Sequence, residues 1–369
     1  MTTVYVLYTG GTIGCKGNPL APMSGPEFQQ LVNSLPGMNL GDVSGYSDLH
    51  YVVNSFEKPL DSSNMIPSDW ITIANKILDN YSKYDGFVIL HGTDTMAFTS
   101  SALSFLLPGL SKPVVVTGSQ LPLSFTLNDA IANLVGSIVL AGTTKIPEIC
   151  LYFDSNLLRG NRSVKVNANR FSAFESPNYP VLAAVGTEIT MNSKDILPPP
   201  PPVNSLENPD NQKLLKQKLI QISENIQRFS VVSLILYPGI DSSTLTGMMS
   251  NTNPPVRGIV IQSFGEGNGP TNKEFLSVLS NANSEGIVLM DNTQVLAGSV
   301  NIGAYATGSG LAKAGALSSH DMTPESSLSK LVYLFGNGFS STDVKKMMQE
   351  DIAGEITRSN ASTVSNQPH

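Results

Sequence analysis

Three short apolar runs in the N-terminal third of the chain are each followed by a polar turn that contains glycine. In sequence order, the runs and their turns are Val4–Tyr8 with Thr9–Thr12, Phe87–Leu90 with His91–Thr95, and Pro113–Val116 with Thr117–Gln120. Helical patterns lie between these runs, for example from about Met96 to Leu107. The order strand, turn, helix predicts parallel βαβ units with helices on both faces of one sheet. Ligands bind beyond the carboxyl ends of such strands, so the three turns mark the expected functional site.

A second strand and helix series begins in the C-terminal half. Its expected strands are Val231–Leu236, Gly258–Gln262 and Gly286–Met290. Its expected helices are Lys273–Asn283 and Pro324–Phe335. A chain of 369 residues has room for at least two domains. We therefore expect an α/β protein with an N-terminal domain over residues 1–185, a linker over 186–229, a second domain over 230–358 and a flexible tail over 359–369.

The expected linker contains five consecutive prolines, Pro198–Pro202, followed by a polar stretch. This insertion, residues 198–212, predicts a semi-rigid, solvent-exposed segment. A ligand for a proline-binding module is an alternative interpretation, and a plain connector is the simpler one. A helix is expected next, from Lys213 to Arg228. Elsewhere, Ser68 and Thr323 are the expected N-caps of two further helices.

Composition excludes several classes of function. The net charge is −7 and the chain has no run of Lys or Arg, so no nucleic-acid partner is expected. Two cysteines, Cys15 and Cys150, are too few for a disulfide framework or a thiolate metal site. The apolar runs are far shorter than the roughly 20 residues of a membrane span, so no membrane association is expected. The N-terminus has neither a basic region nor a cleavage site, which predicts a cytoplasmic protein without a signal peptide.

The first turn, Thr9–Gly14, combines two threonines with three glycines. Glycines at a strand end let the backbone turn sharply and leave amide groups free to face a ligand. A dinucleotide site is not favoured, because the spacing is not Gly-x-Gly-x-x-Gly and no helical pattern follows. Residues 15–22 are instead rich in Gly and Pro, which is typical of a mobile lid.

The second turn brings a hydroxyl and a carboxylate, Thr93 and Asp94, to the end of a neighbouring strand. One interpretation is that either residue caps the helix that follows. The other is that two strand ends present hydroxyls at one edge, where one could attack a carbonyl if a base lies nearby. His91 is a candidate base, but it adjoins an apolar strand and fits a core histidine equally well. No Gly-x-Ser-x-Gly elbow supports a Ser-His-Asp triad.

These two turns resemble the two active-site signatures of the asparaginase family of amidohydrolases. The resemblance continues along nearly the whole chain, apart from the proline-rich insertion and the tail. Further matching segments are Pro59–Ser63, Thr117–Gln120, Arg159–Lys165, Tyr237–Gly239 and Asn301–Gly308. In detail the chain is similar to the type I, cytosolic-type enzymes. The resemblance implies an N-terminal flavodoxin-like parallel sheet domain, a smaller C-terminal Rossmann-like α/β domain, and hydrolysis of L-asparagine to L-aspartate and ammonia without metal or cofactor.

The resemblance also implies roles for four residues. Thr12 matches the nucleophile that forms an acyl-enzyme with the side-chain carbonyl of the substrate. Thr93, Lys165 and Asp94 match a second catalytic group. A hydroxyl is a poor nucleophile near neutral pH, so one member of this group has to accept its proton. Lys165 could be that base, or a charged Lys165 could pair with Asp94, and both remain open.

Substrate-binding residues follow from the chemistry of asparagine, which carries an α-ammonium and an α-carboxylate group. By resemblance, Asp94 and Asp61 match the ammonium side, and Ser62 and Ser63 match the carboxylate side. Ser119 and the Thr93 hydroxyl are also expected to line the binding site. On residues alone, the Asp61–Ser63 segment could equally be a polar turn ahead of a helix.

The chain departs from the family at the lid, where Leu20 stands in the place of the usual tyrosine. Gln262 and Val295 also differ from the arginine and cysteine of bacterial type I relatives, so we do not expect their allosteric control. The alternative function is a catalytically impaired amino-acid binding or sensing homologue. A tRNA-dependent amidotransferase subunit is not expected, because that group carries a further domain ahead of the first motif.

Partners are expected to be the substrate and further copies of the chain. Charged residues make up only 14% of the sequence and hydrophobic residues 41%. Together with the family resemblance, this predicts a homodimer or homotetramer. Asn268 is the residue expected to reach the site of a neighbouring subunit.

Overall fold

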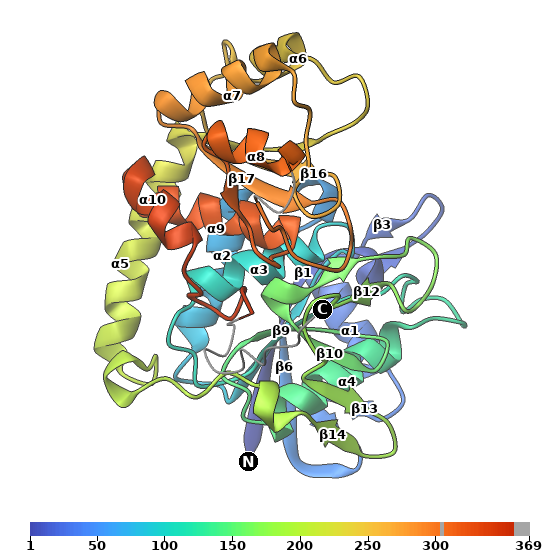
Figure 1. Cartoon of the computed structure of the whole chain (residues 1–369). Coiled ribbons are helices and arrows are strands. Elements are labelled where there is room, and N and C mark those ends of the chain that lie inside the picture. Colours follow the sequence, from blue (N-terminus) through green and yellow to red (C-terminus); the bar gives the residue numbers. More distant parts are fainter. Residues whose placement is uncertain (303–305, 358–369) are drawn as a thin grey trace, which may run out of the picture.

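The computed structural model describes residues 1–302 and 306–357 and contains two α/β parts, each with its own sheet (Figure 1). The larger, N-terminal sheet has the strand order β14-β13-β10-β9-β8-β7-β1-β6-β5-β4. Its five central strands, β6, β1, β7, β8 and β9, run parallel to one another. They comprise Tyr46–Leu60, Thr2–Gly10, Gly86–Leu90, Val114–Thr117 and Ile149–Phe153.

Antiparallel strands extend this sheet at both edges, a feature that the sequence patterns did not predict. One edge carries β4 and β5, and the other carries β10, β13 and β14. They comprise Met38–Asn39, Asp42–Val43, Asn156–Arg159, Ala183–Val185 and Ile189–Met191. These strands are two to four residues long, too short for a recognisable apolar alternation. Tight turns join most of them to their neighbours, whereas residues 160–182 lie between β10 and β13.

The C-terminal sheet is smaller and wholly parallel, in the order β15-β16-β17-β18. Its strands are Ser230–Ile235, Val256–Ser263, Val288–Thr293 and Leu317–Ser318, and its helices are α6 (Ser242–Met249), α7 (Lys273–Ser284), α8 (Ala306–Lys313), α9 (Pro324–Gly336) and α10 (Ser341–Met348). The expected α/β fold with a large N-terminal and a smaller C-terminal sheet is therefore confirmed. The predicted tail, residues 359–369, lies outside the described residues.

Two apolar cores cover the two faces of the N-terminal sheet. Strand β1 shows how they form, because Tyr5 and Leu7 enter one core while Val4, Val6 and Tyr8 enter the other. Helices α2 (Pro67–Asn80), α3 (Met96–Leu106) and α5 (Pro209–Asn225) pack on the first face, and α1 (Gly25–Asn33) and α4 (Ala130–Thr143) pack on the second. Strands β1, β7, β8 and β9 are thus buried on both sides, which leaves their ends for chemistry.

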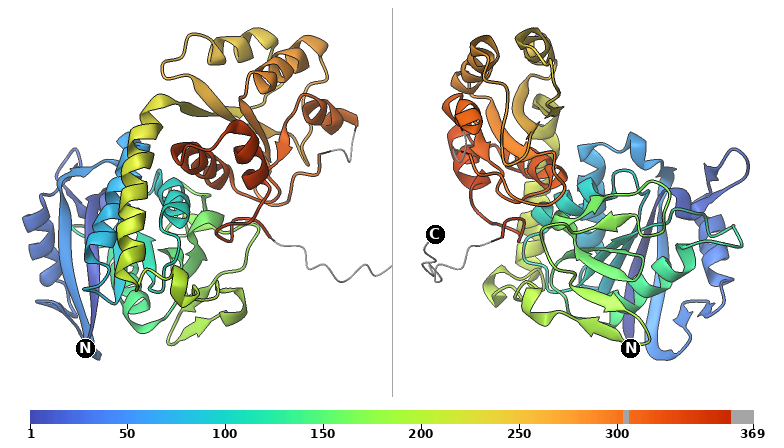
Figure 2. Two further views of the ribbon diagram at one scale, coloured as in Figure 1. Left: turned by 90° about the vertical axis from the view of Figure 1, so that its left-hand side faces the viewer. Right: turned by 45° about the vertical axis from the view of Figure 1, so that its right-hand side comes forward.

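The segment between the two sheets is mostly exposed, as predicted, but it packs against the N-terminal part at Ser205 and Leu206. Leu206 is 1% exposed, and its amide donates to the Gly109 carbonyl at 2.8 Å. The following helix, α5, begins at Pro209 instead of Lys213, since the Asn208 side chain accepts the amide of Asp210 and so caps it. Figure 2 shows α5 running alongside the N-terminal part and up to the C-terminal part.

The two predicted N-caps have different outcomes. Thr323 caps α9 as expected, because its hydroxyl accepts the Ser326 amide at 3.1 Å. Ser68 is not a cap: α2 begins one residue earlier, at Pro67, and the Asp69 carboxylate accepts the Ile66 amide at 2.8 Å. Over the described part of the chain, every helix is too short or too polar to cross a membrane.

Candidate active site

Three glycines bring the ends of β1, β6 and β7 into direct backbone contact. A Cβ atom on Gly10 would lie 2.0 Å from the carbonyl oxygen of Leu60, and one on Gly11 would lie 2.4 Å from the amide nitrogen of Gly92. Both residues also have positive φ angles, 128° and 84°. A Cβ on Gly92 would in turn lie 2.4 Å from the Ser62 hydroxyl. Only glycine permits such close backbone contacts. The glycines of Thr-Gly-Gly-Thr are therefore required for the packing of the strand ends as well as for the turn.

A cavity of about 340 Å³ lies where these strand ends meet. It is lined by Gly11, Thr12, Cys15, Leu20, Pro22, Asp61, Ser62, Gly92, Thr93, Asp94, Gln120, Lys165 and Ala168. Thr12 opens the short helix η1 (Thr12–Gly14), and Thr93 and Asp94 lie in the turn after β7. The structure therefore brings the four predicted catalytic residues to one cavity.

Lys165 joins two of these residues. Its Nζ donates to the Thr93 hydroxyl oxygen at 2.9 Å and to Asp94 Oδ1 at 2.7 Å. The Lys165 side chain is 22% exposed and that of Asp94 is 64% exposed. The lysine thus approaches from within the protein, while the carboxylate faces the opening of the cavity.

Gln120 is a further lining residue to which the sequence analysis gave no role. Its Oε1 accepts the Thr93 hydroxyl at 3.4 Å, and its Nε2 donates to the Arg170 carbonyl at 3.0 Å. The Thr93 oxygen therefore accepts from Lys165 and donates to Gln120, which fixes the direction of its proton. The sequence did place Gln120 in the turn after β8, but this pattern marked the whole turn as part of the site and did not single out one residue.

The predicted substrate-binding residues fall into two groups. Asp61, Ser62, Thr93 and Asp94 line the cavity, whereas Ser63 and Ser119 do not belong to its described lining. Asp61 also accepts the Ser63 amide at 3.0 Å, as expected of a polar turn.

Ser119 is buried, and its hydroxyl donates to the Leu121 carbonyl at 2.6 Å. Ser63 and Ser119 thus each adjoin a lining residue, Ser62 and Gln120.

The predicted lid is a short hairpin, β2 (Cys15–Lys16) with β3 (Ala21–Pro22). Three of its side chains, Cys15, Leu20 and Pro22, line the cavity. Leu20 is 44% exposed. Among the described residues that line the cavity, none is a tyrosine, so the site presents an apolar side chain where relatives are expected to present a phenol.

His91 lies in the core beside the site. Its ring is fully buried, and burial lowers the pKa of His91 to about 4, so the imidazole is neutral. Nδ1 donates to the Gly92 carbonyl at 2.7 Å, and Nε2 accepts the Thr99 hydroxyl at 2.8 Å. Both nitrogens are engaged away from Thr12, which fits the interpretation as a satisfied core histidine.

Other predicted positions belong to the C-terminal part. Gln262 and Val295 line a separate cavity of about 190 Å³, and Asn268 is half-buried outside the cavity that holds Thr12. Within residues 1–302 and 306–357, no cluster of His, Cys, Asp or Glu has the arrangement of a metal site.

Comparisons with known proteins agree with this arrangement. Residues 3–197 match the family described as asparaginase, N-terminal, and residues 230–348 match the glutaminase/asparaginase C-terminal domain. L-asparaginase 1 of Escherichia coli K12 is 39% identical over 357 residues, covering 96% of this chain and 98% of the relative. The 60 kDa lysophospholipase of Mus musculus is 38% identical over 95% of this chain, which spans 62% of that protein.

Solved structures show the same likeness. L-asparaginase I from Vibrio cholerae has a TM-score of 0.79 at 36% identity, with 97% of this chain and 99% of that chain covered. The thermostable L-asparaginase from Thermococcus kodakarensis has a TM-score of 0.80 at 31% identity, with 97% and 100% covered. Because both halves of the chain match in sequence and in structure, the chain belongs to the asparaginase family of amidohydrolases.

Proposed function

We propose that the protein hydrolyses L-asparagine to L-aspartate and ammonia through an acyl-enzyme on Thr12. The observation that carries this mechanism is Lys165, which bonds to the Thr93 hydroxyl and to Asp94 in the cavity that Thr12 lines. A hydroxyl needs a base, and an amide leaving group needs a proton. The linked Thr93, Lys165 and Asp94 provide both within one small volume.

The reaction proceeds in two steps. The Thr12 oxygen attacks the side-chain carbonyl carbon while the Thr93–Lys165 pair takes up its proton. The carbon–nitrogen bond then breaks, and the pair passes this proton to the amide nitrogen, which leaves as ammonia. Water then attacks the ester and releases aspartate, and Thr12 recovers its proton. Thr93 is suited to hold this water, because Lys165 and Gln120 fix its hydroxyl from two sides and its oxygen can still accept a hydrogen bond from the water.

Substrate recognition follows from the charges at the cavity opening. Asp94 and Asp61 provide negative charge for the α-ammonium group, and the Ser62 hydroxyl lies on the same wall for the α-carboxylate. Ser63 and Ser119 would act one step away, because the Ser63 amide holds the Asp61 carboxylate and the Ser119 hydroxyl holds the Leu121 carbonyl next to Gln120. Asparagine fits this pattern because it presents both charges beside a short amide side chain.

We also propose that the protein acts as a homodimer or homotetramer in the cytoplasm, with Asn268 near a neighbouring subunit. Large apolar side chains about half exposed after β15 and β17, such as Tyr237 and Val295, support self-association. Light scattering at assay concentration tests this. A fully active monomer would contradict it, and fractionation of the native cells tests the location.

Thr12→Ala tests the nucleophile. We expect kcat for ammonia release from asparagine to fall at least ~10³-fold while circular dichroism stays unchanged. Thr72→Ala, on the exposed side of α2, is the matched control and should keep full activity. Acid quenching during turnover, followed by peptide mass spectrometry, should find the aspartyl adduct on the peptide that carries Thr12. An adduct on another residue would overturn the assignment. Asparagine binding without any turnover by the unmutated protein would favour a sensing homologue.

A further inference from the structure

Lys165 has little local support for its position. It lies on β11 (Val164–Lys165), which pairs with β12 (Phe174–Glu175) in a sheet of two short strands, separate from the main sheet. The chain enters this strand from the short helix η3 (Gly160–Arg162). The placement of Lys165 against Thr93 therefore depends on what holds η3.

The residues that hold η3 include the last described segment of the chain, residues 351–357, which we term the C-terminal clasp. Asn161 Nδ2 donates to the Ala353 carbonyl at 2.8 Å, and Arg162 Nη1 donates to the Glu355 carbonyl. Just before η3, Arg159 Nη1 donates to the Gly354 carbonyl at 3.3 Å. Three consecutive clasp carbonyls thus bind three side chains around η3.

These contacts are buried, and a second set reinforces them. Asn161 is 0% exposed and Arg162 is 1% exposed. Arg162 Nη2 also donates to the Thr357 hydroxyl at 2.8 Å and to Asp321 Oδ2 at 2.5 Å. Buried hydrogen bonds leave an unsatisfied group when they break, so this connection resists displacement.

The clasp is itself anchored to the C-terminal part by a buried ion pair. Lys330, on α9, lies 2.6 Å from Glu355 Oε1, and both side chains are 0% exposed. The Glu355 carboxylate also accepts the amides of Ile352 and Ala353, the latter at 2.7 Å. The carboxylate therefore fixes the clasp backbone whose carbonyls face η3.

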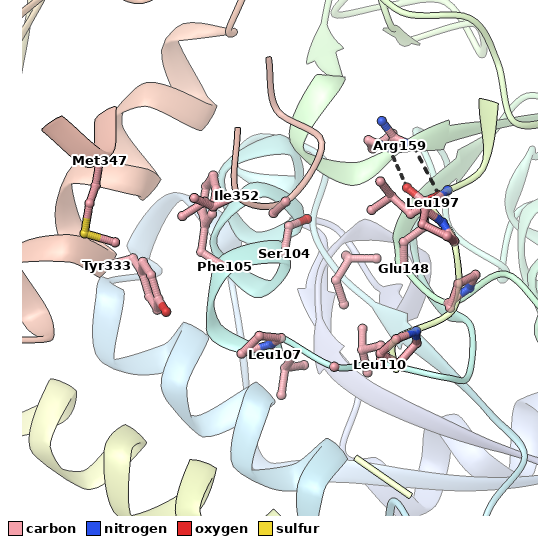
Figure 3. Close-up of a pocket in the computed structure, with 17 residues that line it drawn as sticks. Ser104, Phe105, Leu107, Leu110, Glu148, Arg159, Leu197, Tyr333, Met347 and Ile352 are labelled. Carbon is pink, nitrogen blue, oxygen red and sulfur yellow. Dashed lines mark hydrogen bonds and ion pairs between the residues drawn. The ribbon is translucent and has the colours of Figure 1, made fainter. Parts of the chain in front are cut away.

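The figures show the same connection. In Figure 2 the red C-terminal segment leaves α10 and reaches the green strands of the N-terminal part. Figure 3 shows Ile352 of the clasp on the wall of a cavity of about 350 Å³, with Arg159, Glu148 and Leu197 on the opposite side. The clasp thus crosses from one part of the molecule to the other beside the chain that leads to Lys165.

We propose that the C-terminal clasp is a positioning element for Lys165, which makes kcat depend on a segment that contributes no side chain to the described lining of the active site. This inference rests on the proposed catalytic role of Lys165. A displacement of about 1 Å at a catalytic group can cost on the order of 10²-fold in rate, whereas the cavity walls that bind the substrate come from β1, β6 and β7. A loosened clasp should therefore lower kcat and leave ligand affinity unchanged.

The test is Asn161→Ala, which removes one clasp contact, measured as the intact protein. We expect kcat for asparagine to fall about tenfold while the Kd for L-aspartate stays within about twofold. Leu279→Ala, in the core of the C-terminal part, is the matched control, since it destabilises that part without touching the clasp. It should leave kcat unchanged at a temperature where both variants are folded.

A double-mutant cycle separates positioning from general destabilisation. In a Lys165→Met background, Asn161→Ala should cause no further loss of the residual rate. An equal loss in both backgrounds, or no loss in the Lys165 protein, would overturn the role of the clasp. A fully active Lys165→Met variant would instead overturn the role proposed for Lys165, and the inference with it.

Discussion

The two larger sheets of this molecule share parallel strands and helical crossovers, yet the described lining of the active-site cavity comes from the N-terminal part alone. The strands of the N-terminal sheet end in glycines that touch, as Gly11 touches Gly92. In the C-terminal sheet, β16 ends in Ser263, whose hydroxyl is buried and donates to the Asn292 carbonyl at 2.9 Å. The same topology gives a cavity lined by two threonines, a lysine and two aspartates in one case, and a smaller cavity of about 190 Å³ lined by side chains such as Gln262 in the other. The residues at the strand ends, rather than the fold, therefore decide what kind of site forms at each sheet edge.

Replacing Lys165 has the largest expected effect on this comparison. Lys165→Met should abolish turnover, a loss of at least ~10³-fold in kcat, because it removes the ammonium group that bonds to Thr93. Calorimetric titration should still detect L-aspartate binding. Lys345→Met, on α10 of the C-terminal part, is the control. Asp94→Asn should differ by also weakening aspartate binding, and a pure KM effect in both Lys165→Met and Asp94→Asn would rule out a base at Lys165.

The glycine contacts predict a difference between two positions with similar φ angles. Gly11 and Gly239 have φ values of 84° and 92°, but a Cβ on Gly239 would meet nothing within 4 Å. Gly239→Ala should therefore cost only the roughly 1–2 kcal/mol of a left-handed backbone. Gly11→Ala should cost about 3–5 kcal/mol, since a steric clash adds to the same term. Urea unfolding measures both free energies, and equal losses would show that β1 and β7 can separate.

Buried titratable groups in the two parts should respond to pH in opposite directions. Burial raises the pKa of Asp291 to about 6, and the Ser263 hydroxyl opposes this shift only in part. The folded protein then holds a proton that the unfolded chain releases, so stability falls as pH rises from about 4 to 6. His91, with its lowered pKa, destabilises the fold as pH falls from about 6.5 to 4.

Asp291→Asn should consequently raise the free energy of unfolding by about 3 kcal/mol at pH 7, and by almost nothing at pH 4. Denaturant titrations at the two pH values measure the difference. A gain of equal size at both would point to packing rather than to the buried charge.

The smallest expected effect concerns the lid. Leu20 lines the cavity without a donor or acceptor, so Leu20→Tyr should raise kcat by restoring a hydroxyl near Thr12. The gain should be well below the 10²–10⁴-fold of a tuned acid or base, because the surrounding residues do not orient a phenol. Leu20→Phe controls for ring size. An unchanged or lower kcat in the tyrosine variant would mean that this hairpin no longer serves proton transfer.

Local patterns predicted the features whose cause is local. The apolar strands, the glycine turns and the Thr323 cap each depend on a few adjacent residues, and the structure contains them. Ser68 shows the limit of this approach. It has a side chain typical of an N-cap, but its neighbours Pro67 and Asp69 together place the start of the helix at Pro67. The convergence of Thr12 and Thr93 was predictable because parallel strands end at one edge.

Features whose cause is distant were not predictable in the same way. Gln120 reaches Thr93 because its backbone amide is held by the Asp129 carboxylate, which accepts it at 2.9 Å. Asp129 lies at the start of α4. The contact between Asn161 and Ala353 joins residues 192 positions apart. No spacing or periodicity in a single sequence encodes such a pair, and only the packed fold brings its members together.

The clasp has a consequence for biosynthesis. A ribosome releases the N-terminal sheet long before it adds residue 353, and domains commonly fold as they emerge. On this chain, η3 lacks its clasp partners until residues 353–357 have left the ribosome, so a nascent chain with a folded first domain still has an incomplete setting for Lys165. Hydrolytic activity would then appear only after these clasp residues have docked.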